Sequence, residues 1–159
     1  MDPFLAAART TFRQQQRAFE TLIDGLPIEA LDWQPAPGAN SLAALVTHAW
    51  GSAQAWVLRA AGREIERDRA AEFRAKGDPA ALRTLLAEGG ARIEGALGAI
   101  DLAALGQVRI GPSTRPSSDE EYTGAGCVLH AVEHVQEHLG QAYLTRQLWD
   151  ARRAAGGAR

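Results

Sequence analysis

The sequence has one cysteine, one lysine and no long apolar run, and these shortages exclude several classes of protein. One cysteine cannot build a disulfide framework or a cysteine-based zinc finger. No segment approaches the roughly 18 consecutive apolar residues of a membrane span. The 17 Lys and Arg residues are outnumbered by 19 Asp and Glu residues, so the basic surplus typical of nucleic-acid-binding proteins is missing. We therefore expect neither a nucleic-acid partner nor a membrane location.

The start of the sequence, Met1-Asp2-Pro3, also lacks the basic residues that open a secretory signal. We therefore expect a cytoplasmic protein.

Alanine is abundant where strand-forming residues are scarce. The chain has 32 alanines but only 12 valines and isoleucines together, in a total of 159 residues. Alanine is the best helix former, whereas β-branched residues favour strands. A chain of this length forms one domain as a rule. The composition therefore predicts a single all-α domain.

Four long segments show the three- and four-residue spacing of apolar residues that is typical of amphipathic helices. Capping residues and prolines mark where the first three begin, namely Asp2 before Pro3, Asn40 or Ser41, and Asp78 before Pro79. The predicted helices cover about 3–24, 41–61, 79–100 and, starting from Ser118 or Thr123, a stretch ending near Asp150. Four such helices predict a four-helix bundle formed by residues 1–150, with 151–159 as a frayed tail.

The predicted connections differ in character. Residues 27–40 contain three prolines and form an ordered connection over one end of the bundle, and residues 101–118 form a long loop that covers a pocket. Long loops therefore separate the first helix from the second and the third from the fourth, which leaves the up-and-down order of the helices open. Within 63–76 we expect a short surface helix. The arginine-rich stretch 59–74 contains interleaved acidic residues, including Glu72, and is interpreted as a solvated face.

The four histidines are the residues that can carry chemistry. His130, His134 and His138 follow one another at steps of four, so neighbours in this series project from one helix face, beside the apolar seam. Two histidines four residues apart can bind one divalent ion. The third ligand must come from another helix, and His48 is the only histidine left. Three imidazoles leave coordination positions open, which is the pattern of catalytic sites.

Two other interpretations of the histidines compete with a metal site. Histidines at helical spacing are often surface residues, or core residues satisfied by hydrogen bonds. The segment also fits H-x-x-E-H, the pattern of inverted zinc peptidases. We reject a peptidase because no glutamate follows Glu137 to serve as the further carboxylate ligand.

Three more residues are candidates near the histidines. Gln141, one turn after His138, can hydrogen-bond a ligand imidazole or simply join two helices. Trp33 precedes the helix of His48 and is expected near a pocket mouth. Cys127, two turns before His134, is interpreted as a small core residue.

Two blocks of the sequence resemble the DinB/YfiT-like superfamily. The first comprises Leu26-Pro27, Leu31-Asp32-Trp33-Gln34-Pro35 and Pro37-Gly38-Ala39-Asn40-Ser41-Leu42, followed by Leu45-Val46-Thr47-His48. The second covers 130–141, in which Gly140-Gln141 comes just after the second of two histidines four apart. The similarity spans about residues 3–150.

The resemblance implies a four-helix bundle with a metal site at one end of its core. It matches His48, His134 and His138 to the metal ligands and makes His130 a neighbour of the site. Members of the superfamily bind zinc, nickel or similar ions, and three imidazoles also suit iron or copper. Some members transfer low-molecular-weight thiols, bacillithiol or mycothiol, and many are homodimers.

The resemblance therefore favours a metal-dependent thiol S-transferase that acts on a small-molecule substrate, as a homodimer. Leu139 departs from the basic residue that many relatives carry at this position, which counts against thiol transfer if that position contacts the thiol. The alternatives are a metal-dependent hydrolase and a non-enzymatic, metal-binding stress-response protein.

Overall fold

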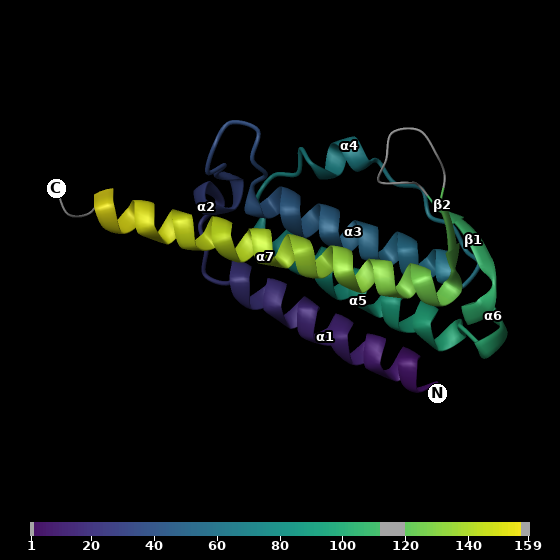
Figure 1. Ribbon diagram of the computed structural model, residues 1–159. Helices are drawn as coiled ribbons and strands as arrows, with labels where there is room; N and C mark the ends of the chain where they lie inside the picture. Colours follow the sequence, from purple (N-terminus) through teal and green to yellow (C-terminus); the bar gives the residue numbers. More distant parts are fainter. Residues whose placement is uncertain (1, 112–119, 157–159) are drawn as a thin grey trace.

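The four predicted helices form the body of the molecule. A computed structural model describes residues 2–111 and 120–156. Its long helices are α1 (Pro3–Ile23), α3 (Leu42–Ala60), α5 (Pro79–Ala99) and α7 (Gly124–Gly156) (Figure 1). The predicted all-α, four-helix bundle is confirmed. None of the helices in the described ranges is both long and apolar enough to cross a membrane.

The helix starts follow the capping residues of the sequence. The side chains of Asp2, Ser41 and Asp78 each accept a backbone N–H from the first turn of α1, α3 and α5, which satisfies donors that have no partner inside the helix. At the start of α7, Thr123 Oγ1 accepts the N–H of Gly126 at 3.0 Å, whereas the alternative cap, Ser118, lies outside the described residues. The helix continues past the expected end at Asp150 to Gly156.

The connections contain more regular structure than we expected. Residues 27–40 include a short helix, α2 (Ile28–Asp32). The expected loop over 101–118 instead begins with α6 (Leu102–Gly106) and β1 (Val108–Gly111), and the rest of it lies outside the described residues. Strand β1 pairs antiparallel with β2 (Glu120–Thr123), where Val108 faces Thr123.

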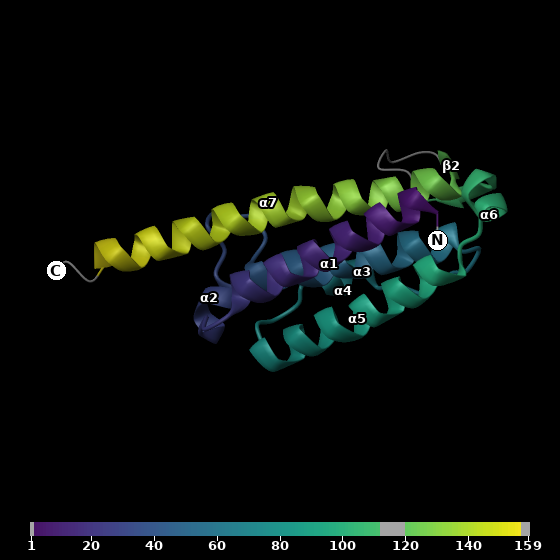
Figure 2. The same ribbon diagram turned by 90° about the horizontal axis from the view of Figure 1, so that it is seen from below.

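The order of the long helices is set by one crossover. Helices α3 and α5 run in the same direction, whereas α1 and α7 run in the opposite direction (Figures 1 and 2). The chain must therefore return along the bundle between α3 and α5. It does so through residues 61–78, which include the short helix α4 (Arg69–Glu72) and pass along the outside of α3. We call residues 61–78 the crossover.

Helix α3 is the most buried element. It packs against α5 and, most extensively, against α7, and it also contacts α2 and α4. Almost all of its residues are therefore buried. Trp50 is fully buried, and its indole N–H donates to the carbonyl of Leu86 on α5 at 3.0 Å. The α3–α7 interface brings together the two helices that carry all four histidines.

Candidate metal centre

Three histidines meet in the α3–α7 interface. His48 comes from the middle of α3, and His134 and His138 come from successive turns of α7. One ring nitrogen from each lies within 4.8 Å of the others. Nε2 of His48 lies 3.2 Å from Nε2 of His134. The histidines that the resemblance selected are therefore the ones that the fold brings together.

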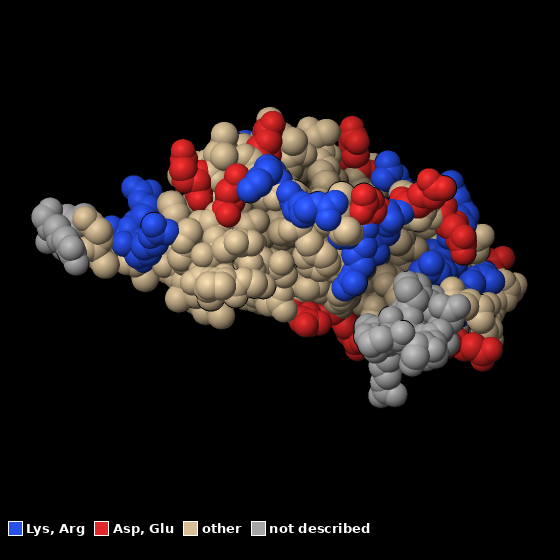
Figure 3. Space-filling model, turned by 90° about the horizontal axis from the view of Figure 1, so that it is seen from above, with Lys and Arg blue, Asp and Glu red and all other residues tan. Residues whose placement is uncertain are grey.

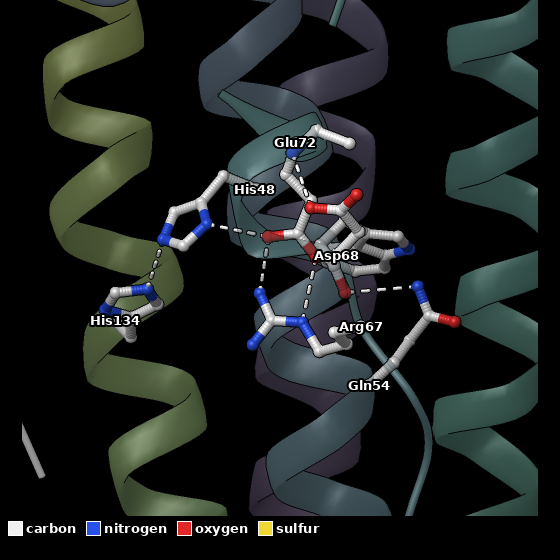
Figure 4. Close-up of polar contacts among 8 residues, drawn as sticks. His48, Gln54, Arg67, Asp68, Glu72 and His134 are labelled. Atoms are coloured by element: carbon white, nitrogen blue, oxygen red, sulfur yellow. Dashed lines mark hydrogen bonds and ion pairs between the residues drawn. The ribbon is translucent and has the colours of Figure 1, made fainter. Parts of the chain in front are cut away.

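The His48 ring is oriented by a carboxylate from the crossover. Nδ1 of His48 lies 2.9 Å from Oε2 of Glu72 (Figure 4). An ionised carboxylate can only accept hydrogen bonds, so Nδ1 carries the proton and donates. In the neutral ring, Nε2 then keeps its lone pair, and this nitrogen faces His134.

The His138 ring is oriented in the same sense by its own helix. Its Nδ1 lies 2.9 Å from Oε1 of Gln141, one turn further along α7. The amide oxygen accepts, so Nδ1 donates and Nε2 keeps its lone pair. That Nε2 atom is buried, and no hydrogen-bond partner reaches it from the described part of the chain. A buried polar atom without a partner is costly, so this nitrogen indicates a site for a further group.

Burial favours the neutral form of the His134 and His138 rings. Desolvation, followed by the nearby rings of His138 and His48, lowers the pKa of His134 from 6.5 to about 3. Desolvation also lowers the pKa of His138, although its hydrogen bond to Gln141 opposes this shift. A neutral imidazole is the form that binds a metal ion.

The donor set fits a divalent transition metal. Imidazole nitrogens bound to zinc at 2.0–2.1 Å and at a tetrahedral angle lie about 3.3 Å apart, close to the 3.2 Å between the Nε2 atoms of His48 and His134. The three histidines can therefore hold a metal ion, and three ligands leave further coordination positions open. Zinc, nickel, iron and copper all accept imidazole ligands, so the donor set does not identify the ion.

Glu72 is a residue of the candidate site that the sequence analysis did not place there. We expected it on a solvated face, and basic and acidic side chains do intermingle on the surface over the crossover (Figure 3). The Glu72 side chain instead turns inward and is only 12% exposed. Burial raises the pKa of its carboxyl, but the hydrogen bonds from His48 and Arg67 and their charges lower it further, so the net shift is downward.

Two neighbours of Glu72 complete this side of the site. The guanidinium of Arg67 donates to both carboxylate oxygens, with Nε 2.9 Å from Oε1 and Nη2 2.6 Å from Oε2. The ring of Phe73 stacks on the His48 ring with centroids 4.1 Å apart. In the sequence, Phe73 is an aromatic residue in a highly charged segment. That was a local sign that part of this segment packs against the bundle.

The remaining sequence candidates lie outside the three-histidine set. His130 packs against Trp56, with centroids 4.3 Å apart, and stacks on His134 at 5.8 Å. Trp33 contacts Trp149, 11 residues and about 16 Å along α7 from His138, so the structure does not bring it to the histidines. Cys127 is fully buried in the core, and burial raises the pKa of its thiol.

A pocket lies one helical turn from the histidines, between α7 and the residues that lead into α3. Its volume is about 280 Å³. Gln141, whose amide oxygen holds His138, forms part of its wall. The lining residues are Pro35, Gly38, Ala39, Asn40, Leu45, Gln141, Leu144 and Thr145. This pocket offers space for an organic molecule near the metal centre.

Comparison with known families gives a match over most of the chain. The sequence profile of the DinB superfamily matches residues 11–142. That range contains His48, His134 and His138. No curated protein sequence matches the chain.

Solved structures share the fold at low sequence identity. A conserved protein from Enterococcus faecalis superimposes with a TM-score of 0.73 at 18% identity, covering 93% of this chain and 97% of that one. YfiT from Bacillus subtilis, described as a probable metal-dependent hydrolase with an unusual four-helix bundle topology, also gives 0.73, at 14% identity, covering 92% of this chain and 89% of that one.

A mycothiol-dependent maleylpyruvate isomerase gives a TM-score of 0.64 at 14% identity. The alignment covers 87% of this chain but only 62% of the isomerase, so the isomerase has a substantial part without a counterpart here. These likenesses establish the fold.

Proposed function

This chain belongs to the DinB superfamily, and from that premise we propose that it is a metal-dependent enzyme whose divalent ion is held by His48, His134 and His138. The observation that carries the proposal is the convergence of three ring nitrogens from two helices, one of which, Nε2 of His138, is buried without a partner among the described residues. A metal ion would give that nitrogen its missing contact.

We propose zinc or nickel as the ion and a low-molecular-weight thiol as the cosubstrate. A divalent ion at this site would hold a thiol as its thiolate near neutral pH, or lower the pKa of a bound water. An anionic thiolate would balance part of the charge of the divalent ion. The mycothiol-dependent isomerase with the same fold supports this choice.

The chain's own residues would supply binding and orientation. Glu72 accepts a hydrogen bond from Nδ1 of His48, and Gln141 accepts one from Nδ1 of His138. In both rings Nε2 is then left to bind the ion. The pocket beside Gln141 has a mainly apolar lining, which suits the organic part of an electrophilic substrate. The reaction class proposed is substitution, in which the thiol sulfur forms a C–S bond with the electrophile, a leaving group such as chloride is expelled, and the thiol proton is released to solvent.

Hydrolysis is the second candidate. It is favoured by the structural likeness to YfiT. The alignment covers 89% of YfiT but only 62% of the isomerase. A hydrolase would turn over an ester or amide without added thiol, whereas a transferase would depend on bacillithiol or mycothiol. A protein that binds metal without catalysis would be stabilised by the ion and would catalyse neither hydrolysis nor thiol transfer. A homodimeric state and a cytoplasmic location stay predictions from the sequence.

The metal part is tested by elemental analysis of protein purified without a histidine tag. We expect about one divalent ion per chain, and a content far below that in His48→Ala. Equal metal contents in the two proteins would contradict the proposal. The thiol part is tested separately by incubating the metal-loaded protein with bacillithiol or mycothiol and a chloro-electrophile. A rate no faster than that of the free metal ion would exclude thiol transfer.

A further inference from the structure

We propose that Glu72 is a positioning residue of the metal centre, which holds His48 in the tautomer and ring orientation that present Nε2 to the ion. This inference rests on the proposed function, because it assigns a role toward the metal that the three histidines would bind. It adds to the site a residue of the crossover, 24 positions from His48 in the sequence.

The first argument is the hydrogen bond itself. A neutral imidazole carries one proton, and whichever nitrogen holds it cannot bind a metal. The carboxylate of Glu72 accepts from Nδ1 at 2.9 Å, so it keeps the proton on the nitrogen that faces away from His134. A carboxylate in this place also makes the ring a stronger ligand, as in other carboxylate–histidine–metal arrangements.

The second argument is that Glu72 is itself fixed from several sides. Arg67 holds both of its carboxylate oxygens (Figure 4). The next residue, Phe73, stacks on the His48 ring, and the Arg69 guanidinium lies 5.3 Å from the centroid of the Phe73 ring. The carboxylate is therefore held against His48, which orients the imidazole before any ion binds.

The third argument is the space that α3 leaves for this carboxylate. Gly51 lies one turn after His48, in the middle of a helix where glycine is unfavourable. A Cβ atom added to Gly51 would lie 2.8 Å from Oε1 and 3.3 Å from Cδ of Glu72. The absence of a side chain at this position therefore makes room for the carboxylate that contacts His48.

Two other acidic residues of the crossover, Asp68 and Glu66, make no hydrogen bond with His48. Asp68 accepts the backbone N–H of Ala71 and so caps α4. Glu66 is exposed and makes no hydrogen bond or ion pair with any described residue, which makes it a matched control for Glu72.

The experiment measures zinc affinity by competition with a chromophoric chelator, on metal-free full-length protein. Four variants are compared with the wild type: Glu72→Ala, Glu72→Gln, Gly51→Ala and the control Glu66→Gln. We expect Glu72→Ala to weaken zinc binding by about 10- to 100-fold, the usual effect of removing such a partner. Zinc stoichiometry should not change, because the three ligands are still present.

The other variants separate positioning from a general structural role. Glu72→Gln keeps an oxygen that can accept from Nδ1 and should restore part of the affinity. Gly51→Ala keeps every polar group but displaces the carboxylate, so affinity should fall while the melting temperature of the metal-free protein does not, because alanine favours helix. Glu66→Gln should match the wild type.

Two failures can be told apart. If the wild type itself binds no zinc, the proposed function is wrong. If the wild type binds zinc and both Glu72→Ala and Gly51→Ala bind it as tightly as Glu66→Gln does, the metal centre stands and the role of Glu72 is overturned.

Discussion

Nε2 of His48 lies 3.2 Å from Nε2 of His134, although 86 positions separate the two residues in the chain. His48 already donates its Nδ1 proton to Glu72, so in the neutral ring its Nε2 has only a lone pair to offer. The two nitrogens face each other across the α3–α7 interface at a separation that suits ligands of one ion.

The identity of the ligands can be tested within α7 alone. We expect His138→Ala to lose most of the bound metal, because it removes the buried nitrogen that has no hydrogen-bond partner in residues 2–111 and 120–156. His130→Ala should keep about one ion per chain, because His130 packs against Trp56 and is not among the three converging histidines. Elemental analysis of the metal content of both variants, purified without a histidine tag, tests this expectation. Equal loss in both would mean that the ligand set is wrong.

Gln141 should tune the metal affinity without being a ligand. Its amide oxygen holds Nδ1 of His138 at 2.9 Å, so we expect Gln141→Ala to weaken zinc binding by about 10-fold. Gln147, an exposed glutamine on the same helix, provides the matched control, and Gln147→Ala should have no effect. Chelator competition measures both. An unchanged affinity in Gln141→Ala would show that this hydrogen bond is dispensable.

The stability of the metal-free protein should fall as the pH is lowered below neutral. The pKa of His134 is about 3 in the folded chain and about 6.5 when unfolded, so between these values only the unfolded chain takes up the proton. Its contribution to stability is therefore complete above pH 6.5 and is lost progressively toward pH 3. At about pH 4.5 we expect a loss of about 1–2 kcal/mol, allowing for solvent screening of a partly exposed ring.

Urea unfolding of the metal-free protein at about pH 7.5 and about pH 4.5 measures this loss. The His134→Gln variant has no imidazole at this position, so its stability should depend less on pH. A pH dependence as steep as that of the wild type would show that His134 is not its source.

Trp50 should matter for stability and not for metal binding. Trp50→Phe removes the hydrogen bond to the Leu86 carbonyl and leaves a cavity in the core, which we expect to cost about 2 kcal/mol in the free energy of unfolding. Trp149 is the control, because its indole N–H has no partner among the described residues. Trp149→Phe should cost less than about 1 kcal/mol. Both variants are measured by denaturant unfolding and by zinc affinity. Equal losses in the free energy of unfolding for Trp50→Phe and Trp149→Phe would contradict the structural role given to Trp50.

Features that depend on residues a few positions apart were predicted from the sequence. The starts of α1, α3 and α5 follow from Asp2, Ser41 and Asp78, because a capping side chain acts on the turn that immediately follows it. The convergence of His134 and His138 follows from their spacing of four on one helix. The resemblance to relatives then selected His48 as their partner.

Features that depend on the path of the chain were not predicted. Glu72 belongs to a segment with as many charges as an ordinary solvated face, and no local pattern distinguishes it from Glu66. The structure separates the two because the crossover returns along α3 and carries Glu72 over His48, where Gly51 leaves room for its carboxylate. Trp33, expected near a pocket mouth, packs against Trp149 in the last part of α7, a contact between residues far apart in the sequence.

The sequence alone determined that the chain forms four amphipathic helices and that two histidines share a face of the last one, because both properties depend only on residues a few positions apart. The tertiary structure decided which way α5 runs, and hence what covers His48. That choice depends on contacts between segments far apart in the chain, which no short window of sequence contains.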